Sequence, residues 1–180
     1  MKIGLVRHFK VTKAFPKNKL FTPEDVTKWF QEYDEADVEI ATVDTKEIEW
    51  ESCFSSDLPR AITTAQTIYK GNIVTTAQLR EIPVPYFKGK LKLPFILWAI
   101  LSRTVMRFTK EAKNDWKEGE QRVQLFLDEI LTKEEDTLIV SHALIMSIME
   151  KELVKRGFVG PTFKIPENGV VYLFEKPEME

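Results

Sequence analysis

The feature that most constrains the fold is an alternation of short apolar runs with segments of helical periodicity. Runs typical of buried strands occur at 3–6, 52–55 and 73–75, within DTLIVSH (136–142), and within NGVVYLFEK (168–176), where an Asn-Gly turn precedes the strand. Helical patterns separate them, beginning at residue 22 and recurring at 55–71, 118–132 and 143–157. Because strands that alternate with helices form mostly parallel sheets, we predict an α/β fold.

Local signals indicate where two of these helices begin. Thr22 precedes Pro23 and two acidic residues, a combination typical of an N-cap, a first helical position and a first turn. For the helix in 55–71, Ser56 or Asp57 is the expected cap and Pro59 falls in the first turn. We therefore interpret Asp57 as a capping residue and not as a catalytic acid.

Length and charge limit the classes of function. A chain of 180 residues without a linker or an internal repeat is expected to form one domain, residues 1–180, with a sizeable core. The net charge of −2 gives no reason to expect nucleic acid as a partner. A local cluster of lysines is either solvated surface or a means of attracting an anionic substrate: Lys10, Lys13, Lys17 and Lys19.

The single cysteine and the apolar segments indicate the compartment. Cys53 excludes an intramolecular disulfide, suits a reducing compartment, and is expected to be a buried, inert thiol. The opening apolar run is too short for a signal peptide. The longest apolar region, 93–108, is interrupted by Arg103 and is too short to span a bilayer. We expect a cytoplasmic protein without a membrane partner.

The positions of the two histidines give the strongest functional signal. His8 follows the strand run at 3–6, and His142 follows the run that ends at Val140. Ligands of open α/β sheets bind at the carboxyl ends of strands, where helix N-termini point. Arg7 precedes His8, and Arg60 lies in the first turn of the helix that follows the run at 52–55. A lone histidine or arginine at such a place is usually structural, but the four together predict a phosphate pocket.

Four segments of the chain carry a family resemblance, and they are LVRHF (5–9), SSDLPRAITTAQTI (55–68), LREI (79–82) and LIVSHA (138–143). In order and spacing they resemble the Arg-His-Gly box, the Ser-Asp-Leu-x-Arg-Ala segment, the proton-donor segment and the second histidine box of the histidine phosphatase (phosphoglycerate-mutase-like) superfamily. The resemblance implies a three-layer αβα sandwich with a mostly parallel central sheet.

The resemblance also implies roles for individual residues. His8 would attack phosphorus and become a phosphohistidine, its other ring nitrogen being held by a backbone carbonyl. Arg7, Arg60 and His142 would neutralise the phosphoryl oxygens, so no metal or other cofactor is expected. Glu81 would protonate the leaving group and then activate water. The alternative for Glu81 is an ordinary surface residue.

The sequence departs from the family pattern at several positions. Phe9 and Ala143 stand where the family usually has glycine, and Ala14 stands where an asparagine is common. Thr12 is a possible substitute for that asparagine in binding substrate. Phe9 suggests either a decayed site or an active enzyme whose Phe9 ring lines the pocket mouth and contacts substrate, and we favour the second.

The resemblance also implies that the segment 86–116, which follows Glu81, sets substrate specificity. It is either a helix packed on the core or a lid with an apolar inner wall, which would suit a hydrophobic leaving group. Its basic residues could instead contact a second anionic group: Lys88, Lys90, Lys92, Arg103 and Arg107.

Together these observations predict a phosphomonoester hydrolase of the metal-independent histidine phosphatase type that acts through a phosphohistidine on a small phosphorylated metabolite. A phosphoglycerate-mutase-type phosphotransferase and a catalytically inert phospholigand-binding protein are the alternatives. The sequence leaves the substrate and the oligomeric state open.

Overall fold

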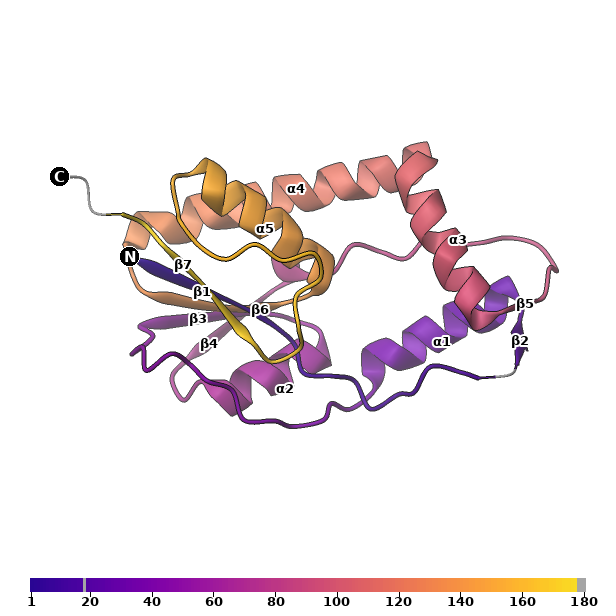
Figure 1. The fold of residues 1–180 in the computed structure, drawn as a ribbon, viewed down its shortest axis with the longest axis horizontal. Helices are drawn as coiled ribbons and strands as arrows, with labels where there is room; N and C mark the ends of the chain where they lie inside the picture. Colours follow the sequence, from indigo (N-terminus) through magenta and orange to yellow (C-terminus); the bar gives the residue numbers. More distant parts are fainter. Residues whose placement is uncertain (18, 178–180) are drawn as a thin grey trace.

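The computed structural model of the protein describes residues 1–17 and 19–177, and the side chain of Arg107 lies outside this description. A five-stranded sheet forms its centre, in the order β4-β3-β6-β1-β7 (Figure 1). The strands are β1 (Lys2–Arg7), β3 (Ser52–Ser56), β4 (Ile73–Thr76), β6 (Thr137–Ser141) and β7 (Val171–Glu175). Strands β1, β3, β4 and β6 are parallel and β7 is antiparallel to β1, which confirms the mostly parallel sheet.

Helices cover both faces of this sheet and confirm the three-layer αβα architecture (Figure 1). One face packs against α2 (Pro59–Ile68) in an apolar cluster that includes Val6, Ala61 and Val140. The other face packs against α4 (Lys110–Ile130) and α5 (Ala143–Lys155) in a larger cluster that includes Phe126 and Met146. Two short 3-10 turns are η1 (Ala77–Leu79), which contributes the buried Leu79 to the core, and η2 (Leu131–Lys133), which follows α4.

Of the two predicted helix starts, the first is confirmed and the second is partly wrong. Thr22 caps α1 (Pro23–Glu35) in a capping box, and its side chain accepts from the Asp25 N–H at 3.2 Å. Helix α2 does begin at Pro59, but its N-cap is Leu58, which among the described residues has no side-chain hydrogen bond to the helix. Asp57 instead accepts from Nε and a terminal nitrogen of Arg80, both at 2.6 Å, because its side chain faces the loop after η1.

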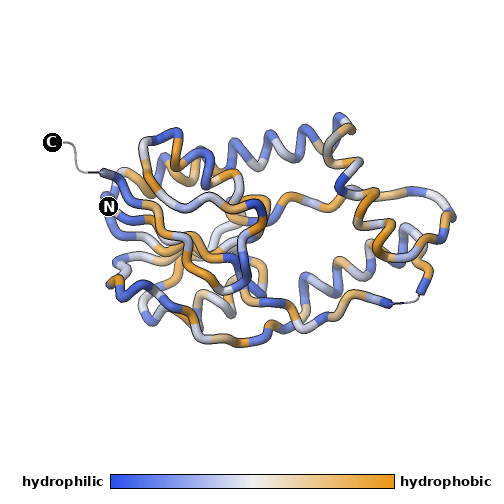
Figure 2. Tube along the Cα trace, in the orientation of Figure 1, coloured by the Kyte–Doolittle hydropathy of each residue, from blue (hydrophilic) through white to orange (hydrophobic). Residues whose placement is uncertain are grey.

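An arm extends from the sandwich on the right of Figure 1. It consists of α1, the two-stranded sheet of β2 (Leu20–Phe21) and β5 (Leu93–Pro94), and α3 (Phe95–Phe108). Trp29 of α1 and Trp98 of α3 belong to an apolar cluster of their own, so α3 packs on α1, and Met106 near the end of α3 also packs against the main core. Figure 2 shows the hydrophobic residues of α3 at this side of the molecule. The segment 86–116 therefore contributes β5 and α3 to the arm.

Two further expectations concern burial and the membrane. Cys53 is buried, and this burial raises the pKa of its thiol to about 12, which confirms the inert thiol. Among the described residues, no helix combines the length and the apolar character that a bilayer crossing requires.

Candidate active site

A cavity of about 640 Å³ lies between the sandwich and the arm. The four residues that the sequence placed in a phosphate pocket come together in its wall with the expected proton donor Glu81: Arg7, His8, Arg60 and His142. The sheet explains why the two histidines meet. Strands β1 and β6 are parallel neighbours with Arg7 opposite Ser141, and the N–H of His8 donates to the carbonyl of Ser141 at 3.0 Å. The next residue on each strand is a histidine, and the two ring centroids lie 5.1 Å apart.

The Nε2 atom of His8 carries no proton and faces the guanidinium group of Arg60. Its Nδ1 lies 2.6 Å from the carbonyl oxygen of Phe9, and because a carbonyl only accepts, Nδ1 carries the hydrogen. Nε2 then accepts from Nε of Arg60 at 3.3 Å. Burial, together with the charges of Arg60 and Arg7, lowers the pKa of His8 to about 3. The imidazole is therefore neutral at physiological pH, with a lone pair on Nε2.

Two guanidinium groups flank this imidazole. The Arg60 side chain is buried, donates to Asp34 of α1 at 2.7 Å, and lies 5.6 Å from the ring centre of Tyr33. Arg7 donates to the carbonyl of Pro166 at 3.0 Å, and its buried Nε has no partner among the described residues. Two fixed positive charges therefore stand beside a neutral imidazole.

His142 completes the cationic side of the cavity. Its Nε2 lies 2.9 Å from the hydroxyl of Ser56, and within the described part of the chain its buried Nδ1 has no partner. Burial first, and then the charge of Arg60, lower its pKa well below the usual value. An anion bound between the two imidazoles would oppose this lowering, because it favours their protonated forms.

Glu81 is a partly buried carboxyl group in the cavity wall, held by three backbone N–H groups, so its interpretation as an ordinary surface residue is wrong. It accepts from the backbone N–H of Ile82 at 3.1 Å, and from those of Leu144 and Ile145 in the first turn of α5 at 3.2 and 3.3 Å. Burial raises its pKa, although these hydrogen bonds act in the opposite direction. A carboxyl group with a raised pKa beside a phosphate pocket suits proton transfer.

Sequence reasoning missed the groups that hold these side chains. Asn168 donates to the carbonyl of His8 at 2.6 Å, so the Asn-Gly turn before β7 also holds the backbone of His8 in position. The hydroxyl of Thr64 accepts from the Phe9 N–H at 2.8 Å and donates to the Arg60 carbonyl at 2.7 Å. Asp34, which fixes Arg60, also went unnoticed, because it lies in an acidic stretch typical of solvated surface.

The expectation that the Phe9 ring lines the pocket mouth is wrong. The side chain is 1% exposed, is not part of the cavity wall, and has an ordinary negative φ. Its ring fills the space beside Gly169, where a Cβ would lie 3.0 Å from Phe9 Cδ1 and where φ is +68°. Thr12 is also outside the cavity wall, and its exposed hydroxyl donates to the carbonyl of Asp37 at 3.1 Å.

This placement of Phe9 gives a testable prediction. Phe9→Ala should lower the free energy of unfolding by about 3–5 kcal/mol, the usual cost of emptying a buried phenylalanine site, while kcat stays near that of the parent protein. Urea denaturation and phosphatase assays measure the two quantities. Phe108→Ala is the matched control, since Phe108 is 73% exposed. A stable Phe9→Ala protein without activity would contradict the structural role.

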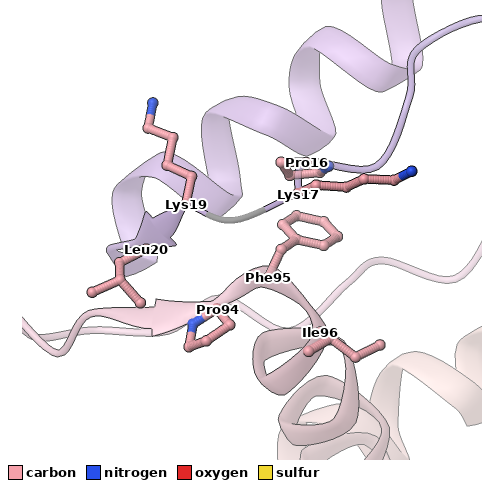
Figure 3. Close-up of a pocket in the computed structure, with 7 residues that line it drawn as sticks. All are labelled: Pro16, Lys17, Lys19, Leu20, Pro94, Phe95 and Ile96. Carbon is pink, nitrogen blue, oxygen red and sulfur yellow. The ribbon is translucent and has the colours of Figure 1, made fainter.

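Other candidate sites were sought among the described residues. A second cavity, of about 500 Å³, lies at the tip of the arm between residues 16, 17, 19 and 20 on one side and residues 94–96 on the other (Figure 3). Figure 3 shows the Phe95 ring in it, with the ammonium groups of Lys17 and Lys19 directed away. Within the described ranges, no group of three or more His, Cys, Asp or Glu side chains is arranged to hold a metal ion.

Comparison with known proteins identifies the class. The family description of the histidine phosphatase superfamily (branch 1) matches residues 32–175, and the chain belongs to this superfamily. Phosphoester chemistry is therefore the reaction class to consider for the cavity. The matched span begins after Arg7 and His8, so these two residues are linked to the site by the fold. A search of curated proteins found no match.

Solved structures share the fold. Phosphoserine phosphatase from Entamoeba histolytica in complex with 3-phosphoglyceric acid is 19% identical, with a TM-score of 0.51 over 86% of this chain and 80% of that chain. A mutant of that enzyme with phosphoserine gives a TM-score of 0.52 at the same identity and coverage. Alpha-ribazole phosphatase from Shigella flexneri is 17% identical, with a TM-score of 0.48 over 86% and 80% of the two chains.

Proposed function

We propose that the protein hydrolyses phosphate monoesters of small metabolites through a phosphohistidine at His8. The observation that carries this proposal is the arrangement around His8, whose Nε2 has a lone pair and lies 3.3 Å from Nε of Arg60, with a second imidazole beside it and the Glu81 carboxyl group in the same cavity wall. The unpartnered Nε of Arg7 supports it, because a buried donor normally has an acceptor and a phosphoryl oxygen would supply one.

In the first step, the Nε2 lone pair of His8 attacks phosphorus and the bond from phosphorus to the ester oxygen breaks. The protonated Glu81 carboxyl group gives its proton to the departing oxygen, so the alcohol leaves neutral and Glu81 becomes a carboxylate. Arg7, Arg60 and His142 stabilise the charge on the three phosphoryl oxygens. The Phe9 carbonyl stabilises the positive charge that develops on the imidazole, through the Nδ1 hydrogen bond.

In the second step, the Glu81 carboxylate takes a proton from water while the water oxygen attacks phosphorus. The bond from phosphorus to nitrogen breaks and its electron pair returns to Nε2. Inorganic phosphate leaves, and His8 and Glu81 return to their starting states. The reaction as written assigns every proton and charge to this chain's own side chains, so we propose that it needs no metal and no other cofactor.

The position of Phe9 bears on the inert alternative. A large side chain at the glycine position suggested a blocked or decayed site, but the ring points into the space beside Gly169 and leaves the cavity free. The phosphoglycerate-mutase alternative gains no support from Thr12, since its hydroxyl is directed to the Asp37 carbonyl.

Phosphate release from 4-nitrophenyl phosphate, with and without EDTA, tests the proposal. We expect turnover in both conditions, and acid-labile phosphate on His8 after rapid quenching and peptide mass spectrometry. Phosphate trapped on His142 would reverse the two roles. Absence of turnover across a broad panel of phosphate esters would favour the inert protein.

A further inference from the structure

We propose that the substrate is a phosphate monoester whose leaving group is apolar and carries no second anionic group. This inference rests on the proposed hydrolase function and adds the substrate class to it. The cavity of about 640 Å³ is far larger than a phosphoryl group requires and falls in the range of pockets that enclose whole organic ligands. The cavity walls beyond the phosphate pocket therefore determine which leaving groups a bound phosphate ester can have.

An aromatic wall on α1 begins next to the phosphate pocket. Tyr33 lies over the guanidinium of Arg60, and its ring stacks on Trp29 with the centroids 5.2 Å apart. Trp29 in turn contacts Phe30 edge-on at 5.1 Å and stacks on Phe15 at 5.3 Å. All four rings line the cavity. A group leaving from phosphorus would thus move along a preformed aromatic surface, which favours apolar and aromatic groups.

Most of the remaining wall is apolar, and Thr27 and Gln31 of α1 are the neutral polar side chains that it contains among the described residues. Residues 82–86 (Ile-Pro-Val-Pro-Tyr) follow the catalytic carboxyl group directly and line the cavity together with Met106 of α3. Proline residues provide no backbone N–H, so this wall offers few donors to a polar leaving group. Tyr86 and Met106 also give the segment 86–116 the specificity role that its sequence suggested.

The charges in the wall argue against a second anionic group on the substrate. Apart from the phosphate-binding set, Arg80 is the one cation in the cavity wall among the described residues, and it is held by both oxygens of Asp57 at 2.6 Å. The Asp34 carboxylate also lines the cavity and would repel a substrate carboxylate. The basic residues proposed from sequence for this task, Lys88, Lys90, Lys92 and Arg103, do not line this cavity.

Alkyl phosphates test this inference because they all lose a similar primary alkoxide, which keeps chemical reactivity nearly constant. For ethyl, butyl and hexyl phosphate we expect kcat/KM to rise by about three- to fourfold per methylene that enters the apolar wall. Phosphoserine, with a charged leaving group, should be worse than ethyl phosphate. A flat series, or a preference for phosphoserine, would overturn the inference while leaving hydrolysis intact.

Variants of single side chains test which part of the cavity wall causes the preference for longer alkyl groups. Phe30→Ala should reduce the ratio of the hexyl to the ethyl kcat/KM severalfold, and Tyr86→Ala, at a position 67% exposed and therefore safe for folding, should reduce it less. Phe108→Ala, outside the cavity wall, should leave the ratio unchanged. Equal ratios in all three variants would contradict the assignment of the wall. Failure of the parent protein to turn over 4-nitrophenyl phosphate and every other ester of the panel would instead refute the hydrolase function itself.

Discussion

His8→Ala is expected to lower kcat by about 10⁴-fold or more, because the variant has no atom in the place of Nε2 to accept the phosphoryl group. The loss should be total within the sensitivity of a 4-nitrophenyl phosphate assay. The covalent phosphate found after rapid quenching should disappear as well. Phosphate or vanadate should still bind the variant, since Arg7, Arg60 and His142 remain, and a thermal shift with either anion measures this binding.

His142→Ala is the informative companion to this variant. It removes a charge-stabilising group but keeps the nucleophile, so we expect a smaller loss of kcat, of about 10²–10³-fold, with phosphate still trapped on His8.

Rescue by imidazole is a further test of the His8→Ala variant. Added imidazole can occupy the space left by the missing side chain and accept the phosphoryl group. Partial recovery of turnover with imidazole would show that the variant lost its nucleophile and not its fold. Near-normal turnover by His8→Ala would end the proposed mechanism.

The sheet and the central cluster could be predicted because their signals are local. A buried strand needs only a short apolar run, and a strand end needs only the residue that follows it, so His8 and His142 could be placed at the ligand edge from sequence alone. That they touch depends on β1 and β6 being neighbours in register, which is a property of the whole topology. The strand-end positions predicted a shared pocket, and the family resemblance supported it, but no local pattern reports the contact itself.

The interpretations that failed concern side chains with two possible partners. Asp57 had the sequence context of a helix cap, but Arg80, 23 residues away, provides a stronger, charge-assisted partner. For the Phe9 ring, the sequence near residue 9 indicated no place other than the pocket. The space that the ring fills lies beside Gly169, in a turn 160 residues later in the chain. Long-range contacts of this kind produce no periodic pattern in the sequence, so they cannot be predicted from it.

Glu81→Gln should separate the two chemical steps. Nitrophenolate leaves without a proton, so the first step on 4-nitrophenyl phosphate should persist, whereas attack of water on the phosphoenzyme loses its base and should slow by about 10²–10⁴-fold. We expect a burst of one nitrophenol per active site, followed by slow turnover, with phosphate accumulating on His8. Glu111→Gln, at an exposed position at the start of α4, is the matched control and should show no burst.

The pH dependence of kcat/KM for an alkyl phosphate tests the same assignment. Glu81 must be protonated in the first step, and because burial raises its pKa, activity should decline as the pH rises through that raised value. His8 must be neutral, and with its pKa lowered to about 3, its protonation limits activity only in strong acid. The alkaline decline should be missing in Glu81→Gln, whose amide does not titrate. If the decline persists there, Glu81 is not the group whose titration causes it, and its carboxyl group, which accepts from the first turn of α5, serves to hold that helix in place.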